Sequence, residues 1–159
     1  MKFLAALCAI AFLAFGVTTQ ASASPTLGPV STFFVGTGAT SLTKSGITIG
    51  CTANLQGDID SSGVGHITDA YFTSGSSLCF TTTAIDLPWT ATANFVGISG
   101  GIVNIYPFAV STVLGSCGGS LLTVNINTSG VISFSDKPLL GGCTVSGSIQ
   151  TTPRVYLVP

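Results

Sequence analysis

The sequence predicts an all-β fold, either an antiparallel β-sandwich or a barrel of short strands. Three observations support this prediction. Apolar and polar residues alternate with a period of two, Thr, Val, Ile and Phe are abundant, and Gly, Ser, Asn or Pro interrupts the alternation about every eight to twelve residues. The 3.6-residue apolar stripe of an amphipathic helix is missing from the sequence.

The first 23 residues are expected to form a secretory signal peptide. Lys2 gives a positively charged start, residues 3–17 are almost all apolar, and Ala21, Ser22 and Ala23 form a small-residue cleavage site. The apolar run is about 15 residues long, whereas a membrane-spanning helix needs roughly 20. We therefore expect cleavage after Ala23, a periplasmic or extracellular location, and no transmembrane segment in the mature chain.

The rest of the chain is expected to form one β domain, residues 31–159, after a flexible N-terminal lead at residues 24–30. Trp89 follows Leu87 and Pro88, and a proline at the entry of a strand costs no ladder hydrogen bond. We expect Trp89 to anchor the core rather than to bind a ligand. The predicted strands cover residues 31–36, 47–59, 65–73, 78–84, 90–96, 101–113, 121–127, 131–135, 144–151 and 154–158.

Four cysteines of the predicted mature chain lie in a half-repeat. Cys51 and Cys117 each begin an alternating strand, a Ser-Gly turn and a second alternating strand, and Cys79 and Cys143 end these segments. Cysteines of a secreted chain usually form disulfides, and four of them allow three connectivities. The repeat favours Cys51–Cys79 and Cys117–Cys143, each closing the open end of a hairpin. A zinc site is disfavoured because the chain has no CxxC pair.

Charged side chains are scarce. They make up 6% of the chain, Glu is absent, and the formal net charge is -1, whereas an average soluble domain is about 25% charged. The lack of a basic stripe excludes a nucleic-acid-binding protein. A hydrophobic content of 46% excludes a disordered acidic tail. The polar surface must come from hydroxyl groups, because residues 24–159 contain 18 Ser and 20 Thr.

One segment partly matches a calcium-binding loop. Asp58, Asp60 and Ser62 stand at loop positions 1, 3 and 5, Gly63 stands at position 6, and Asp69 stands at position 12. Position 12 normally holds the longer Glu, and the flanking residues are predicted to be strands rather than helices. We therefore favour a polar hairpin turn and keep a calcium site as the alternative.

Catalytic motifs are weak. His66 is the only histidine, and residues 97–101 satisfy the GxSxG pattern with Ser99 as the serine. That motif needs a strand-to-helix turn and a histidine after the serine, and neither condition is met. The aspartates offer no convincing pair for glycoside hydrolysis. We expect a protein that is not an enzyme and that has no cofactor.

A series of short motifs runs through most of the predicted mature chain, from about residue 36 to residue 149. The motifs are Thr43–Ile47 leading to Cys51, Leu55–Gly57, Ile67–Ala70 with Phe72–Gly75, Leu78–Cys79, Asp86–Thr90, Cys117–Gly119 and Gly142–Gly147. Together they resemble the secreted PraB-type family of activators of alkane oxidation, and the Leu87, Pro88 and Trp89 element is the most specific. The resemblance implies an exported, non-enzymatic protein linked to growth on alkanes, and it brings no catalytic residues.

Two functions follow from these observations. The first is a surface-active, hydrocarbon-interacting or matrix factor at the cell exterior, because a weakly charged, hydroxyl-rich surface favours association with other copies, with matrix components or with an oil–water interface. The alternative is a fimbrial or adhesin-like subunit that polymerises by strand donation, with residues 30–35 as the donor strand and the segment around Tyr156 as a terminal strand.

Overall fold

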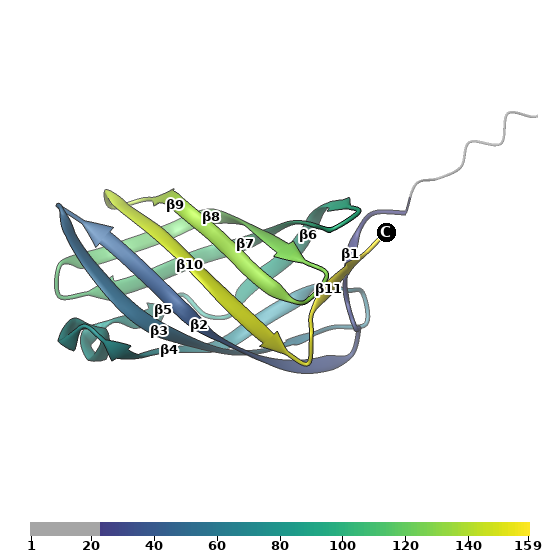
Figure 1. Ribbon diagram of the computed structural model, residues 1–159, viewed down its shortest axis with the longest axis horizontal. Coiled ribbons are helices and arrows are strands. Elements are labelled where there is room, and N and C mark those ends of the chain that lie inside the picture. Colours follow the sequence, from purple (N-terminus) through teal and green to yellow (C-terminus); the bar gives the residue numbers. More distant parts are fainter. Residues whose placement is uncertain (1–22) are drawn as a thin grey trace, which may run out of the picture.

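The computed structural model describes residues 23–159, and these residues form an antiparallel β-barrel of eight wall positions (Figure 1). This confirms the all-β prediction and selects the barrel over the sandwich. The predicted signal peptide lies almost entirely outside the described residues. The wall is formed by β2 (Thr32–Lys44), β3 (Ile47–Ile59), β4 (Gly65–Gly75), β5 (Thr83–Ile85), β6 (Trp89–Gly97), β7 (Gly100–Thr112), β8 (Gly115–Asn127), β9 (Val131–Leu139) and β10 (Cys143–Thr152).

Each wall strand except β5 pairs with the strand that follows it, and β10 returns to pair with β2. The short strands β5 and β6 share one position, because both pair with β4 on one side and with β7 on the other. The turns are tight, as at Ser45 and Gly46 between β2 and β3, where both residues have positive φ angles of 51° and 78°. Such turns match the twist of a hairpin.

The wall has one weakly bonded seam. Across the described lengths of β8 and β9, the strands pair only at Asn125 with Ser133 and at Ile126 with Ile132. Towards the other end of these strands, the Gly118 N–H donates a hydrogen bond to the carbonyl oxygen of Leu140 over 3.0 Å. The rest of the seam therefore has no regular ladder, although the Leu140 N–H also donates a hydrogen bond to the Ser120 hydroxyl oxygen.

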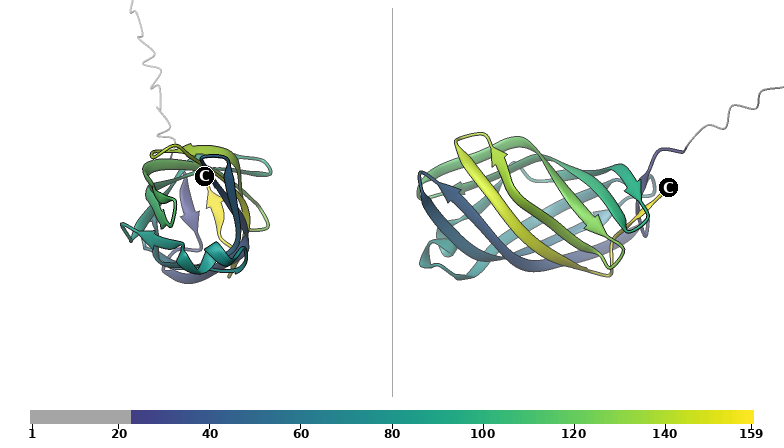
Figure 2. Two further views of the ribbon diagram at one scale, coloured as in Figure 1. Left: turned by 90° about the vertical axis from the view of Figure 1, so that its left-hand side faces the viewer. Right: turned by 45° about the horizontal axis from the view of Figure 1, so that its top comes forward.

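The two ends of the barrel are built differently. At one end, the small sheet of β1 (Thr26–Gly28) and β11 (Tyr156–Val158) lies across the opening. Figure 2, left, looks along the barrel from the other end and shows these two strands at the far side. Within residues 24–30, which the sequence predicts to be a flexible lead, Thr26–Gly28 pair with β11 and Leu27 is buried. We name this the capped end.

The opposite end carries both disulfides. Cys51 is bonded to Cys79 and Cys117 is bonded to Cys143, which confirms the predicted pairing. The turns after β2, β7 and β9 and the 3-10 helix η1 (Ser77–Thr81) lie there. We name this the disulfide end; it is the left-hand end in Figure 1.

Several predicted strand bounds need correction. The segment 78–84 is not one strand, because η1 precedes the short β5. Side chains that bond to the backbone favour a turn over a ladder there: the Thr81 and Thr82 hydroxyls both donate to the Leu78 carbonyl oxygen, over 2.8 and 3.1 Å. Strands β2, β8 and β9 are also longer than the predicted 31–36, 121–127 and 131–135.

Candidate functional site

The barrel interior is apolar and incompletely filled. Alternate residues of each strand point inward, as expected for a β-strand, and in β3 they bury Ile49, Ala53, Leu55 and Ile59. A cavity of about 50 Å³ remains between the wall strands in the half nearer the disulfide end. A second cavity of about 30 Å³ lies under the cap and is lined by Leu27 together with other apolar residues and Gly65.

The two cavities are neighbours. Four side chains line both of them, Leu55, Ile67, Ile105 and Ile132. The first cavity touches three hydroxyl side chains near the disulfide end, Thr40, Ser41 and Thr82, and is otherwise lined by apolar residues. The barrel interior therefore contains two neighbouring apolar cavities, which we together name the bore.

Trp89 forms part of the bore wall. Its side chain is 1% exposed, its Nε1–H donates a hydrogen bond to the Ile85 carbonyl oxygen over 2.8 Å, and its ring lies 4.6 Å from that of Phe108 between centroids. Both rings line the larger cavity. Trp89 lies in the core, as its position after Leu87 and Pro88 predicts, and it also borders empty space.

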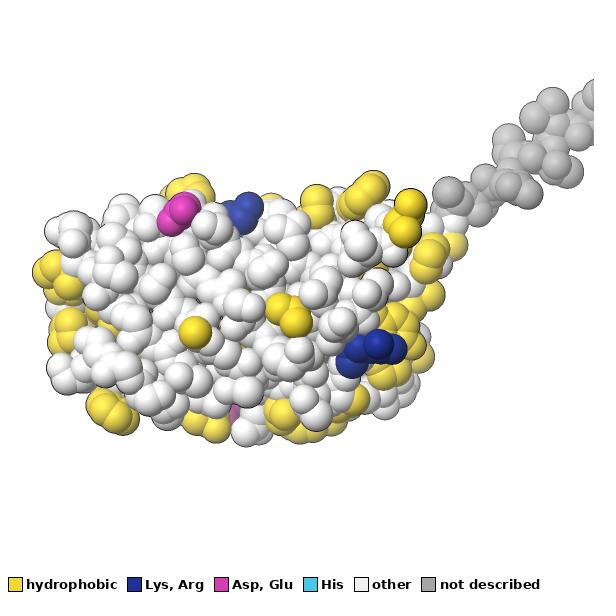
Figure 3. Space-filling view, viewed as in Figure 1, with side chains coloured by type: hydrophobic (Ala, Val, Ile, Leu, Met, Phe, Trp, Pro, Cys, Tyr) yellow, Lys and Arg dark blue, Asp and Glu magenta, His cyan; other side chains and the backbone are white. Residues whose placement is uncertain are grey.

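Apolar side chains are exposed on several turns at the disulfide end. Ile47 follows the β2–β3 turn, Phe80 lies on η1, Val113 lies between β7 and β8, and Leu140 lies between β9 and β10. Phe80 is 74% exposed and Leu140 is 65% exposed. In Figure 3, hydrophobic side chains mark the left-hand edge of the molecule. We name Ile47, Phe80, Val113 and Leu140 the apolar rim.

The flanks of the barrel are hydroxyl-rich. The face of β2, β9 and β10 that Figure 3 shows is mainly white, which denotes uncharged polar side chains and backbone. Neighbouring strands are joined on the outside by side-chain hydrogen bonds, such as 2.8 Å between the Thr43 and Thr48 hydroxyls and 2.9 Å between those of Thr52 and Ser74. Such cross-strand pairs stabilise a sheet. On this barrel, hydroxyl groups rather than charged groups form most of the polar surface.

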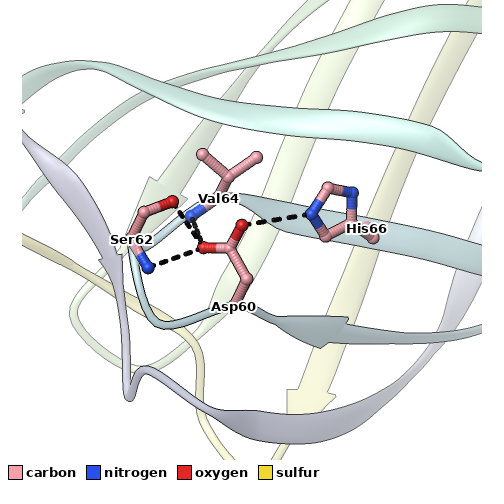
Figure 4. Close-up of polar contacts among 4 residues, drawn as sticks. All are labelled: Asp60, Ser62, Val64 and His66. Carbon is pink, nitrogen blue, oxygen red and sulfur yellow. Dashed lines mark hydrogen bonds and ion pairs between the residues drawn. The ribbon is translucent and has the colours of Figure 1, made fainter.

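The predicted polar turn is present between β3 and β4 (Figure 4). The Asp60 Oδ1 atom accepts hydrogen bonds from the Ser62 hydroxyl, the Ser62 N–H and the Val64 N–H, over 2.7, 2.8 and 3.0 Å. Its Oδ2 atom lies 3.3 Å from His66 Nε2. These contacts, led by the Ser62 hydroxyl and then the Val64 N–H, hold the pKa of Asp60 well below its ordinary value.

The residues of the alternative calcium set are placed as follows. Asp58 lies opposite His66 in the β3–β4 pair, Asp69 lies opposite Gln56 further along β4, and Asp60 and Ser62 bond to each other in the turn. Among the residues that the structure describes, no group of three or more His, Cys, Asp or Glu side chains gathers as a metal site does. The calcium alternative stays a prediction.

Ser99, the serine of the GxSxG pattern, lies in the exposed two-residue turn between β6 and β7. The turn joins two antiparallel strands, as the sequence predicts, so the strand-to-helix context of a nucleophile is not formed.

Within residues 23–159 the structure contains no helix with the length and apolarity to cross a membrane.

Sequence reasoning missed the bore and the apolar rim. A signal for the bore exists: Gly36, Ala53 and Gly57 are small residues at inward positions of neighbouring strands, where large ones would fill the barrel. The rim has a simpler signal, which is a large apolar residue in or beside a turn.

Comparison with known proteins gives one match. Neither the search of curated proteins nor the search of solved structures found a match. Residues 1–159, the whole chain, match the family described as alkane oxidation protein activator PraA/PraB-like. With its all-β barrel and paired cysteines in place, the chain therefore belongs to the PraA/PraB-like family of alkane oxidation protein activators.

Proposed function

We propose that this protein is exported and assists alkane oxidation from outside the cytoplasm, as a non-catalytic factor that adsorbs to hydrocarbon. Family membership supports the link to alkanes. Two disulfides favour an oxidising compartment, and the leader-like residues 1–23 support export. A composition with one His and no Glu favours action without acid–base catalysis.

The observation that carries the proposal is the apolar rim. Exposed apolar groups that cluster at one site mark a contact surface. The rim side chains come from separate turns, and disulfide Cys51–Cys79 ties the turn that carries Phe80 to β3. Charged groups lie towards both ends: Asp58, Asp60 and Arg154 lie towards the capped end, and Lys44 lies at the disulfide end, where its Nζ donates a hydrogen bond to the Ser116 carbonyl oxygen. The rim alone therefore supports the disulfide end as the end that contacts hydrocarbon.

The experiment measures the interfacial tension of a hexadecane drop in a solution of the exported protein. We expect the wild type to lower the tension more than an inert globular protein does. The double variant Phe80→Ser/Leu140→Ser should lose most of this effect, and the matched double variant Phe95→Ser/Ile98→Ser at the capped end should keep it, because Phe95 and Ile98 are also exposed. No lowering by the wild type, or equal loss in both variants, contradicts the proposal.

A structural role in the extracellular matrix is the second candidate, and the hydroxyl-rich flank is the observation that favours it. Strand donation by residues 30–35 does not fit the barrel well, because most of this segment lies in β2, which already pairs with β3 and β10. Association through the flanks would leave each barrel intact. Electron microscopy distinguishes the candidates: regular fibres favour the matrix subunit, and separate particles favour the hydrocarbon factor.

A further inference from the structure

A surface hollow at the capped end combines apolar walls with a positive charge. It measures about 250 Å³ and lies between the β6–β7 turn, the β8–β9 turn and β11. Val96 and Leu157 supply apolar side chains, and Arg154 and Tyr156 also line it. Towards the right-hand end of Figure 3, a basic side chain lies beside hydrophobic ones. The hollow shares no lining residue with the bore, and Arg154 is exposed, so a ligand can reach it from solvent.

The backbone that carries Arg154 is fixed against the β8–β9 turn by a buried threonine. The Thr151 N–H and hydroxyl both donate to the Gly130 carbonyl oxygen, over 3.1 and 2.9 Å. The Val155 N–H donates in turn to the Thr151 hydroxyl oxygen over 2.9 Å. The guanidinium carbon of Arg154 lies 5.8 Å from the centroid of the Tyr156 ring. Arg154 is therefore positioned beside the hollow before any ligand arrives.

The electrostatics of the hollow favour an anion. Among residues 23–159 the recorded ion pair is that between His66 and Asp60, so Arg154 has no acidic partner there, and no aspartate of these residues lines the hollow. Asn127 adds a donor: its Oδ1 atom accepts two backbone N–H groups of its own turn, over 2.9 and 3.0 Å, which leaves its amide nitrogen to donate. The hollow thus presents hydrogen-bond donors and a net positive charge.

The shape and the walls of the hollow narrow the ligand class. A guanidinium group matches a carboxylate, because its planar fork can donate two parallel hydrogen bonds. Apolar walls favour an alkyl chain attached to that carboxylate over a small mineral anion. A cavity that holds benzene measures about 150 Å³, and this hollow is larger, at about 250 Å³. A longer chain can continue over the surface, where Ile98 of the β6–β7 turn and Val158 of β11 are exposed.

We propose that this hollow binds one single-chain carboxylate, such as a fatty acid, with its carboxylate on Arg154 and its chain against Val96 and Leu157. The inference goes beyond the proposed function, because the site lies at the opposite end from the apolar rim and does not depend on it. Oxidation of an alkane at its terminal carbon leads to a carboxylate of this class. The site would thus hold a product of the chemistry that the family is described as activating.

The experiment is a calorimetric titration of the exported, disulfide-bonded protein with sodium decanoate, kept below the concentration at which micelles form. We expect saturable binding with one site per chain. Acetate has the carboxylate without the chain, and 1-decanol has the chain without the charge, so each should bind at least tenfold more weakly. Decanoate binding that does not saturate, or equal affinity for 1-decanol, overturns the proposal.

Matched variants test the location. Arg154→Gln should weaken decanoate binding at least tenfold, whereas Lys137→Gln removes the same charge from β9, outside the hollow, and should bind as the wild type does. If Arg154→Gln fails to fold, Thr128→Asp places a negative charge at an exposed position in the hollow and should also weaken binding at least tenfold. Its control is Ser129→Asp, at the next exposed residue, which does not line the hollow. Wild-type affinity in folded Arg154→Gln or Thr128→Asp overturns the proposal.

Two further measurements separate the alternatives. A protein that binds phosphatidylglycerol vesicles through Arg154, but does not bind decanoate, contacts a membrane surface instead, and this result overturns the proposal. Decanoate binding by a wild type that leaves the hexadecane tension unchanged supports the carboxylate site and contradicts adsorption at the rim. Lowered tension without decanoate binding has the opposite meaning.

Discussion

Cys117 and Cys143 join β8 to β10, two strands that are not neighbours in the sheet, with 5.9 Å between their Cα atoms. The bond lies at the end of the β8–β9 seam where ladder pairing is missing from the described strands. It reaches past β9 and, with the hydrogen bond from the Leu140 N–H to the Ser120 hydroxyl oxygen over 2.9 Å, closes the wall.

The double variant Cys117→Ala/Cys143→Ala should therefore be less stable by roughly 3–4 kcal/mol, the chain-entropy value for a loop of this size. Hydrogen exchange should also quicken along β8 and β9. The control is Cys51→Ala/Cys79→Ala, which has a similar loop length but should quicken exchange at η1 and β3. Identical exchange changes in both variants would contradict a role for Cys117–Cys143 in closing the seam.

Trp89→Phe should lower the free energy of unfolding by about 1–3 kcal/mol. The change removes the hydrogen bond to the Ile85 carbonyl oxygen and enlarges a cavity that is already present. Urea denaturation followed by circular dichroism measures the loss. Tyr106→Phe, at a residue that is 55% exposed, is the control and should change stability by less than about 0.5 kcal/mol.

Substitutions at two adjacent glycines allow the cost of backbone strain to be measured apart from the cost of a steric clash. Both have positive φ, 129° at Gly118 and 72° at Gly119. A Cβ at Gly118 would collide with the Phe108 carbonyl oxygen and the Ala109 backbone, whereas one at Gly119 would meet open space. Gly118→Ala should therefore cost well over 1 kcal/mol and clearly more than Gly119→Ala, roughly 1 kcal/mol, when the two are compared by thermal melting. Equal losses would show that no close approach exists at Gly118.

The same glycines show where sequence patterns fail. The bounds of β3 are Ile47–Ile59 as predicted, because alternation runs unbroken from a Ser-Gly turn. In β8 the prediction starts at Leu121, since Gly118 and Gly119 have the composition of a loop, although the strand begins at Gly115. The pairing of β8 with β7 continues past these two glycines through register shifts. The alternation within one strand carries no information about the strand that pairs with it.

The disulfide pairing could be predicted from the sequence, whereas the bore could not. The repeated segments from Cys51 and Cys117 were enough to predict both pairings, because each hairpin brings its own two ends together. The bore depends on the combined volume of inward side chains from all wall strands, so no single segment predicts it. The burial of Leu27 also needed the fold, since its partner strand β11 lies at the other end of the chain.

The stability of the protein should depend on pH in part through the ionisation of Asp60. Its pKa is lowered by folding, so the carboxylate stabilises the native state above the ordinary Asp pKa of 3.8, and this stabilisation is lost as pH falls towards the lower folded-state value. Asp60→Asn should melt below the wild type at neutral pH, and the difference should shrink progressively below pH 3.8. Ser62→Ala, which removes the leading hydrogen bond, should show a weaker acid dependence than the wild type. A difference between wild type and Asp60→Asn that is constant with pH would contradict this assignment.

Calcium should leave the melting temperature unchanged. Asp60 Oδ1 already accepts three hydrogen bonds within its turn, and a cation there would have to displace them. Calorimetry in millimolar calcium and in a chelator tests this expectation. A melting temperature that rises with calcium would instead support the alternative set of Asp58, Asp60, Ser62 and Asp69.

The hydroxyl coat has a consequence for the conditions under which the protein works. Dissolved salt weakens attraction and repulsion between exposed charges, but residues 24–159 carry only three basic side chains and five aspartates. Hydration of the flanks depends instead on Ser, Thr and Asn groups such as Thr52 and Ser74, which neither titrate in ordinary media nor respond to ionic screening. The tendency of the barrel to associate with other copies should therefore differ little between fresh water and brine.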